Sequence, residues 1–245
     1  MKNGLLNLAI CISGGGTTMR EIMRACRDHR LLHVNPALVI SSRPDAGGIE
    51  KAKGEGILEK DIVVLVRKQF ENSDAFSEAI LKECRFREVD LIAQCGFLPL
   101  MPSNVIATYR SKIFNQHPGP LDQNRLGFGG KGMYGQRVHH AVVYFSKRVG
   151  RPFRTEATVH RVTDEVDGGA ILGIRPVEIT DGDNAQKLAA RVLPYEHGLV
   201  IETILQFSEF GGPHEIHRES PLIKEGEESL LNEAKKSGIE TFPNG

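Results

Sequence analysis

The sequence has no net charge. Its 245 residues include 31 lysines and arginines against 31 aspartates and glutamates, which balance at pH 7. A balanced chain sets up no strong field to attract nucleic acid or an anionic membrane surface. We therefore expect small-molecule substrates as its partners, with no nucleic acid and no membrane, and we expect a monomer or a homodimer.

Cysteine is scarce, and no two cysteines are spaced as Cys-x-x-Cys. The four residues are Cys11, Cys26, Cys84 and Cys95, and the first and last lie inside apolar runs. This pattern predicts reduced, mostly buried thiols of a cytoplasmic protein. No cluster of histidine and cysteine predicts a metal site.

Long apolar segments and internal repeats are also missing. The first apolar run, residues 5–12, is too short to cross a membrane, whereas the 40% share of hydrophobic residues is ample for a core. At this length the chain fits one large domain or two small ones. We expect a main domain over residues 1–210, in two halves that meet near residue 100, and a tail over residues 211–245.

Apolar runs that predict buried strands alternate with segments whose apolar residues recur at helical spacing. The expected strands cover residues 5–12, 37–41, 62–66, 89–95, 112–115, 155–162 and 171–179. The expected helices cover residues 19–26, 46–54, 73–84, 102–110, 138–147, 183–207 and 225–236, the third of them capped by Ser73. This alternation is typical of an α/β, Rossmann-like fold, with a mostly parallel open sheet and helices on both faces.

A glycine turn joins the first strand to the first helix in the stretch Ser13-Gly14-Gly15-Gly16-Thr17-Thr18. Glycine lets the backbone approach an anion closely, and free N–H groups at a helix start favour phosphate. The stretch matches neither the dinucleotide pattern G-x-G-x-x-G nor a P-loop. It is either an anion site or only a tight turn, and the strand and helix around it favour the anion site.

An amide and an imidazole stand at the end of the fifth expected strand. Side chains alternate along a strand, so Asn115 and His117 would point to the same face, and Pro118 would end the strand. The carboxyl edge of an open α/β sheet is where such folds bind ligands. A histidine there can move protons and an asparagine can donate to an oxyanion. The alternative is that both side chains only complete a turn.

An acidic turn, Asp164-Glu165-Val166-Asp167-Gly168-Gly169, follows much later in the chain. Asp167 on its own would be a turn residue beside a glycine. In order with the glycine turn and the Asn-x-His-Pro stretch, however, it completes a known pattern. Over residues 5–207 the chain resembles the phosphoribosylglycinamide formyltransferases, a folate-dependent formyltransferase family of purine synthesis.

The resemblance implies roles for the residues that match the family's motifs. The catalytic residues would be Asn115, His117 and Asp167. The phosphate and ribose of the substrate would bind at Gly14, Gly16, Thr17, Thr18 and Glu196. The co-substrate 10-formyltetrahydrofolate would bind at Leu98, Pro99, Leu100, Met101, Asn115, Val162 and Asp164. Residues 132–134 would cover the amine substrate, and no metal is implied.

The residue types suit formyl transfer to an amine. As the amine of glycinamide ribonucleotide attacks the formyl carbon, an oxyanion develops, the amine loses a proton and N10 of the folate gains one. Asn115 and a protonated His117 would stabilise the oxyanion, and Asp167 would keep His117 charged. Phosphate binding at the glycine turn would hold the amine near the carbon.

The chain departs from the family at Ser73 and Pro99, where an arginine is usual, and in its longer segment 122–157. Two alternative functions are compatible with the same fold. One is a folate-dependent formyltransferase that acts on another amine, such as an amino sugar nucleotide. The other is a relative that binds folate or a nucleotide without turnover. The presence of all three catalytic residue types, Asn115, His117 and Asp167, argues against this second alternative.

Overall fold

A computed structural model describes residues 4–245, so the first three residues of the expected main domain lie outside the described chain. The structure divides into two compact units. The first unit comprises the residues up to Asn115 together with 161–164 and 200–213. The second unit comprises 116–160, 165–199 and 214–245.

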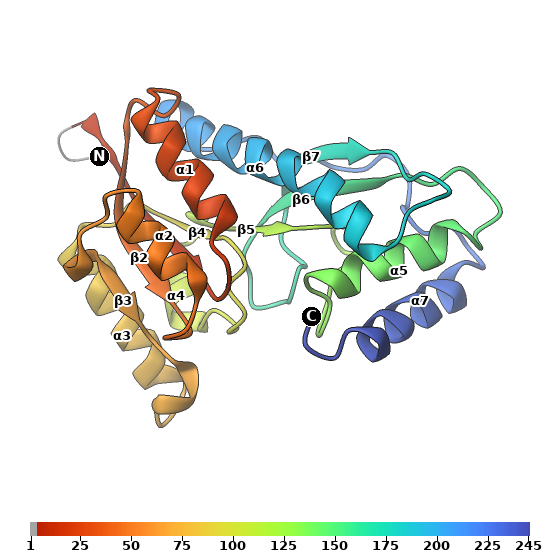
Figure 1. The fold of residues 1–245 in the computed structure, drawn as a ribbon, viewed down its shortest axis with the longest axis horizontal. Coiled ribbons are helices and arrows are strands. Elements are labelled where there is room, and N and C mark those ends of the chain that lie inside the picture. Colours follow the sequence, from red (N-terminus) through yellow and green to blue (C-terminus); the bar gives the residue numbers. More distant parts are fainter. Residues whose placement is uncertain (1–3) are drawn as a thin grey trace. The chain divides into compact units, whose positions relative to one another are not determined.

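Parallel strands and helices alternate along the first part of the chain (Figure 1). The strands are β1 (Leu6–Ile12), β2 (Val34–Ser41), β3 (Ile62–Val64), β4 (Leu91–Gln94) and β5 (Ile113–His117). The helices are α1 (Thr17–Arg27), α2 (Gly47–Gly54), α3 (Ser73–Phe86) and α4 (Ser103–Thr108). The pairs β1–β2, β1–β4, β2–β3 and β4–β5 are all parallel. This arrangement confirms the predicted alternation.

The later elements include one antiparallel pair. They are α5 (Gln136–Ser146), β6 (Thr155–Arg161), β7 (Ile171–Val177), α6 (Ala185–Phe210) and α7 (Glu228–Thr241). Strand β6 pairs with β7 in antiparallel fashion, and the strand order is β3-β2-β1-β4-β5-β6-β7. The predicted α/β fold with a mostly parallel sheet is confirmed. Among the described residues, no helix is both long enough and apolar enough to cross a membrane.

The start of α3 corrects one sequence prediction. Ser73 is the first residue of the helix, and the cap is Asn72, whose side-chain oxygen accepts a hydrogen bond from Ala75 N at 2.9 Å. An N-cap residue has non-helical backbone angles and its side chain reaches an N–H of the first turn. Asn72 meets both conditions, so the prediction of Ser73 as the cap is wrong by one residue.

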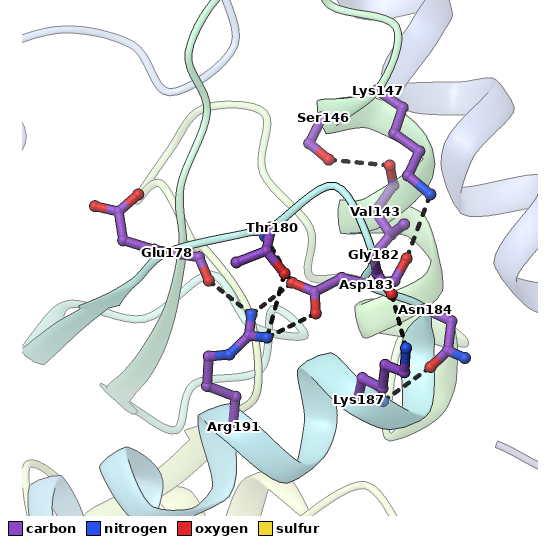
Figure 2. A network of polar contacts seen from close by, with 10 residues as sticks. All are labelled: Val143, Ser146, Lys147, Glu178, Thr180, Gly182, Asp183, Asn184, Lys187 and Arg191. Carbon is purple, nitrogen blue, oxygen red and sulfur yellow. Dashed lines mark hydrogen bonds and ion pairs between the residues drawn. The ribbon is translucent and has the colours of Figure 1, made fainter.

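The start of α6 is held by polar contacts within the second unit (Figure 2). Asn184 Oδ1 accepts from Lys187 N at 2.9 Å, which is the geometry of an N-cap. Next to it, the carboxylate of Asp183 receives two hydrogen bonds from Arg191, at 2.5 and 2.7 Å. The hydrogen bonds from Arg191 lower the pKa of Asp183. The segment that leads into the long helix is therefore tied to it by a charge-assisted, bidentate pair.

The cysteines are free thiols in the structure, as the sequence predicts. Cys11, Cys84 and Cys95 are buried, and Cys26 is half-buried. Burial raises the pKa of Cys84 to about 12 and that of Cys26 to about 11. A buried thiol with a raised pKa is a poor nucleophile, so these residues serve packing.

Phe114→Ala is expected to destabilise the first unit. Phe114 is fully buried, and its ring stacks on that of Phe207 with 6.0 Å between centroids. Truncation of a buried phenylalanine leaves a cavity and costs about 3–5 kcal/mol. Urea unfolding followed by circular dichroism measures the loss. Phe210→Ala, at a ring that is 77% exposed, serves as the control. A Phe114→Ala midpoint equal to that of Phe210→Ala would contradict this account of the core.

Candidate active site

Strand β5 ends at His117, immediately before Pro118, and carries both residues of the Asn-x-His stretch. Asn115 is half-buried and His117 is buried. The alternation of side chains along a strand turns both toward one face. Asn115 belongs to the first unit and His117 to the second.

In the second unit, Asp167 lies between two imidazoles. Its Oδ2 atom is 3.7 Å from Nδ1 of His117, and its Oδ1 atom is 3.4 Å from Nε2 of His160. The N–H of Gly130 also donates to Oδ2, at 2.8 Å. The structure therefore brings together His117 and Asp167, as the family resemblance implied, and adds His160 and Gly130 to them.

The backbone of Asp167 is in the left-handed region, with φ at +57°. The glycine-rich segment packs against this turn so closely that a Cβ added to Gly129 would lie 2.7 Å from Cβ of Asp167. Only glycine permits that approach. Residues held in sparsely populated backbone regions gather at functional sites, so the geometry supports a functional role for Asp167.

Burial and neighbouring groups shift the pKa values of both members of the pair. Burial works to raise the pKa of Asp167, but His117, His160 and the Gly130 N–H lower it well below its usual range, so the carboxylate is ionised. Burial lowers the pKa of His117, and Asp167 offsets this only in part. Desolvation thus disfavours the imidazolium that the mechanism implied by the resemblance requires, and a protonated His117 stays a prediction.

One nitrogen of His117 is left for another partner. Nε2 is buried, and within residues 4–245 it has no hydrogen-bond partner. Buried polar atoms nearly always make a hydrogen bond, and exceptions need an explanation. Because Nδ1 faces Asp167, Nε2 is the ring nitrogen of His117 whose hydrogen-bonding capacity is unused among the described residues.

His160 was missed in the sequence reasoning. It lies in β6, an alternating strand that leads into the acidic turn of Asp167. The only signal available was a histidine near the end of that strand, and a lone histidine on a buried face is usually a core residue. The 3.4 Å distance from His160 Nε2 to Asp167 Oδ1 depends on the conformation of the turn between the two residues. The periodicity of apolar residues does not predict that conformation.

Glu196 is buried on α6 in the second unit. Burial raises its pKa to about 7, and Gln116 Nε2 lies 3.5 Å from its Oε1. A carboxyl group with that pKa is partly protonated at neutral pH and can donate as well as accept a hydrogen bond. These properties suit a contact with a polar ligand, and the predicted contact with ribose remains a proposal.

The glycine turn lies in the first unit and is shaped by close backbone packing. Gly16 precedes α1 with φ at +63°, and a Cβ added there would lie 2.7 Å from Cα of Gly48. Gly14 is exposed, Thr17 is half-buried and Thr18 is buried. A cation that the sequence reasoning missed, Lys51, donates to the Gly15 carbonyl at 2.6 Å. The turn therefore combines a helix start with a lysine, which favours an anion.

The strip predicted to bind folate begins beside this turn. The hydroxyl of Ser13 accepts from Leu98 N at 2.8 Å and is 2.5 Å from the hydroxyl of Ser42. Within the strip Leu98 and Leu100 are 51% and 71% exposed, Pro99 is half-buried and Met101 is buried. Two exposed leucines separated by one residue leave apolar surface open to a ligand.

The two other residues predicted for the folate site also lie in the first unit. Val162 donates its N–H to the carbonyl of Ile113 at 3.1 Å, which places it beside the start of β5. Asp164 is exposed. The first unit thus holds the glycine turn, the folate strip, Asn115, Val162 and Asp164, and the second holds His117, Asp167 and Glu196.

The fold and the His117–Asp167 pair define an α/β protein with a candidate proton-transfer site, and comparison with known proteins identifies the family. Residues 6–204 match the formyl transferase family model. The chain belongs to the formyl transferase family.

Individual relatives and solved structures show which members of the family this chain is similar to. The chain is 34% identical, over 198 residues, to the chloroplastic phosphoribosylglycinamide formyltransferase of Arabidopsis thaliana, which covers 80% of this chain and 63% of the relative. The crystal structure of phosphoribosylglycinamide formyltransferase from Brucella melitensis is 33% identical, with a TM-score of 0.70, over 84% of this chain and 96% of that one. Glycinamide ribonucleotide transformylase 1 from Symbiobacterium toebii is 29% identical, with a TM-score of 0.72, over 85% and 90%. The chain spans about three fifths of the length of the plant relatives.

Proposed function

We propose that this protein transfers a formyl group from 10-formyltetrahydrofolate to the amine of glycinamide ribonucleotide, a step of purine synthesis. Relatives and solved structures that bear the corresponding names support the proposal. The observation that carries it is the buried Nε2 atom of His117, which has no partner among the described residues while Nδ1 faces the ionised Asp167. That arrangement is a base held in one orientation for a substrate proton.

The proposed reaction begins with a neutral His117. The amine of the nucleotide attacks the formyl carbon, a C–N bond forms, and negative charge develops on the formyl oxygen. Nε2 of His117 accepts a proton from the amine, and Asp167 stabilises the resulting imidazolium. An N–H of the Asn115 amide donates to the oxygen. The oxyanion then reforms the carbonyl as the bond between the formyl carbon and N10 breaks, and the proton that His117 took from the amine passes to N10, which leaves His117 neutral again.

The substrates would bind at features of the first unit that suit their chemistry. The phosphate of the nucleotide fits the glycine turn at Gly14, Gly16, Thr17 and Thr18, where Lys51 adds a positive charge. The folate fits the strip that carries the exposed side chains of Leu98 and Leu100. Glu196 would contact the ribose. The monomer or homodimer and the cytoplasmic location remain predictions.

Gly16→Ala is expected to weaken nucleotide binding. A side chain at this position is disfavoured by the left-handed backbone and would lie 2.7 Å from Cα of Gly48. Such strain is worth about 1–3 kcal/mol, so the KM for glycinamide ribonucleotide should rise about tenfold or more, with the KM for folate little changed. Gly54→Ala, where nothing lies within 4 Å of an added Cβ, is the control. Equal nucleotide KM values for the two variants would count against a phosphate site at the turn.

The experiment that tests the proposed function is a direct assay of formyl transfer. Purified protein is mixed with 10-formyltetrahydrofolate and glycinamide ribonucleotide, and the absorbance of the released folate is followed. Turnover that requires both substrates supports the proposal. Folate binding without turnover on glycinamide ribonucleotide would direct the search to another amine, such as an amino sugar nucleotide, and absence of folate binding would overturn the proposal.

A further inference from the structure

The C-terminal helix lies beyond the part of the chain that matches the family model, which ends at residue 204. Helix α7 runs beside α5 in the second unit (Figure 1). Its Lys235 is half-buried, and Nζ donates a hydrogen bond to the carbonyl of Gly129 at 2.8 Å. An element outside the family region thus reaches the glycine-rich segment beside Asp167.

Lys235 and Asp167 bind opposite sides of one peptide group. The carbonyl of Gly129 accepts from Lys235, and the N–H of the same peptide bond, that of Gly130, donates to Asp167 Oδ2 at 2.8 Å. A peptide bond is planar, so a fixed direction of the carbonyl fixes the direction of the N–H. A charged donor on the carbonyl also polarises the peptide and strengthens the N–H as a donor.

Helix α7 is itself anchored, so the position of Lys235 is defined. Gly238 packs so closely on α5 that an added Cβ would lie 2.5 Å from the carbonyl oxygen of Arg137. The guanidinium of Arg137 donates to the carbonyls of Phe242 and Pro243, at 2.7 and 2.6 Å. Nε2 of His140 lies 2.9 Å from the hydroxyl of Ser237, which adds a contact between the two helices.

We propose that Lys235 is a positioning residue for Asp167: through the Gly129–Gly130 peptide it aims the N–H that holds the carboxylate beside His117. The proposal rests on the proposed function, since Asp167 and His117 are the pair that would handle the proton. It also assigns a purpose to the C-terminal segment, which supplies a cation to the site from outside the family region.

The charge of Lys235 provides a second effect that can be measured separately. Burial lowers the pKa of Lys235 and Asp167 raises it. The pKa of His117 is lowered mainly by desolvation. Asp167 raises this pKa, and His160 and Lys235 lower it further. His139 on α5 also interacts with His117. Removal of the Lys235 cation should therefore raise the pKa of His117, because a like charge no longer opposes protonation.

The test compares Lys235→Met, Lys235→Arg and the control Lys236→Met. Lys236 is the exposed neighbour on the same helix, with 77% of its side chain accessible. Lys235→Met should lower kcat about tenfold to a hundredfold, because small displacements of reacting groups are costly, with both KM values little changed. Lys235→Arg keeps a cationic donor and should recover part of kcat, and Lys236→Met should match the unsubstituted protein.

A readout without turnover separates this proposal from the proposed function. The titration of His117 is followed by NMR on protein with labelled histidine, and Lys235→Met should shift it to higher pH by about half a unit to one unit. Formyl transfer by the unsubstituted protein tests the proposed function alone. An unchanged kcat for folded Lys235→Met, in a protein that does transfer formyl groups, would overturn the positioning role of Lys235, and an unmoved His117 titration would overturn its separate charge effect.

Discussion

Asp167→Asn is expected to lower kcat for formyl transfer by about a thousandfold, within the range that a positioned proton-transfer group contributes. The substitution keeps the size of the side chain but removes its charge. It replaces an ionised group that lies within 3.4–3.7 Å of His160 and His117. Without that charge the imidazolium formed during the reaction loses its stabilising partner. Steady-state kinetics with saturating folate and nucleotide measure the loss.

The same variant has a predicted pH signature. Asp167 raises the pKa of His117 against the effect of burial. Its removal should lower that pKa, so the acid limb of kcat/KM, where His117 takes up a proton, should move to lower pH. Lys235→Met should move the same limb to higher pH. An acid limb that stays in place in Asp167→Asn would contradict the assignment of the limb to His117.

The control for Asp167→Asn is Asp181→Asn, at an exposed carboxylate of the same unit. It should retain full activity. Thermal unfolding of both variants shows whether the fold persists. An Asp167→Asn variant that is folded and turns over like Asp181→Asn would remove Asp167 from the mechanism.

Asn115→Ala is expected to lower kcat by about a hundredfold to a thousandfold, the typical effect of losing one donor to a developing oxyanion. Asn115 stands on β5 two residues before His117, with its side chain half-buried. The donor would act on charge that exists only in the transition state. The decrease should therefore appear equally in kcat and kcat/KM, with KM unchanged.

Asn232→Ala is the matched control for this experiment, because Asn232 is an exposed asparagine on α7. It should leave both kinetic constants unchanged. If Asn115→Ala instead raises the folate KM and leaves kcat intact, Asn115 serves only in binding. Product analysis by mass spectrometry confirms that the residual activity is formyl transfer.

The alternation of strands and helices could be read from the sequence because it is a local, periodic property. An apolar run or a helical spacing of apolar residues can be recognised within about a dozen residues. The structure contains a strand or helix at each predicted position. The first and last residues of a helix or strand are harder to predict from the sequence. The cap of α3 was assigned to Ser73 and belongs to Asn72, since the side chains of both residues suit a cap and only the backbone angles distinguish them.

Some residues of the candidate site could likewise be predicted from the sequence, and others could not. The order of the glycine turn, the Asn-x-His-Pro stretch and the acidic turn was enough to indicate the family, since these motifs are contiguous stretches of sequence. Nothing in the sequence joined His160 or Lys235 to Asp167. Those contacts follow from the antiparallel strand before the turn and from the packing of α7 on α5, which bring together residues far apart along the chain.

The sequence by itself therefore determined the fold class, the family and the chemical types of the candidate site residues, because periodicity and short motifs encode them. Only the tertiary structure decided the direction of the pKa shift of His117, the ionised state of Asp167 and the contact of the C-terminal helix with the glycine-rich segment beside Asp167. The physical reason is that protonation depends on burial and on neighbouring charges. Both arise when distant segments pack, and neither is a property of any one stretch of sequence.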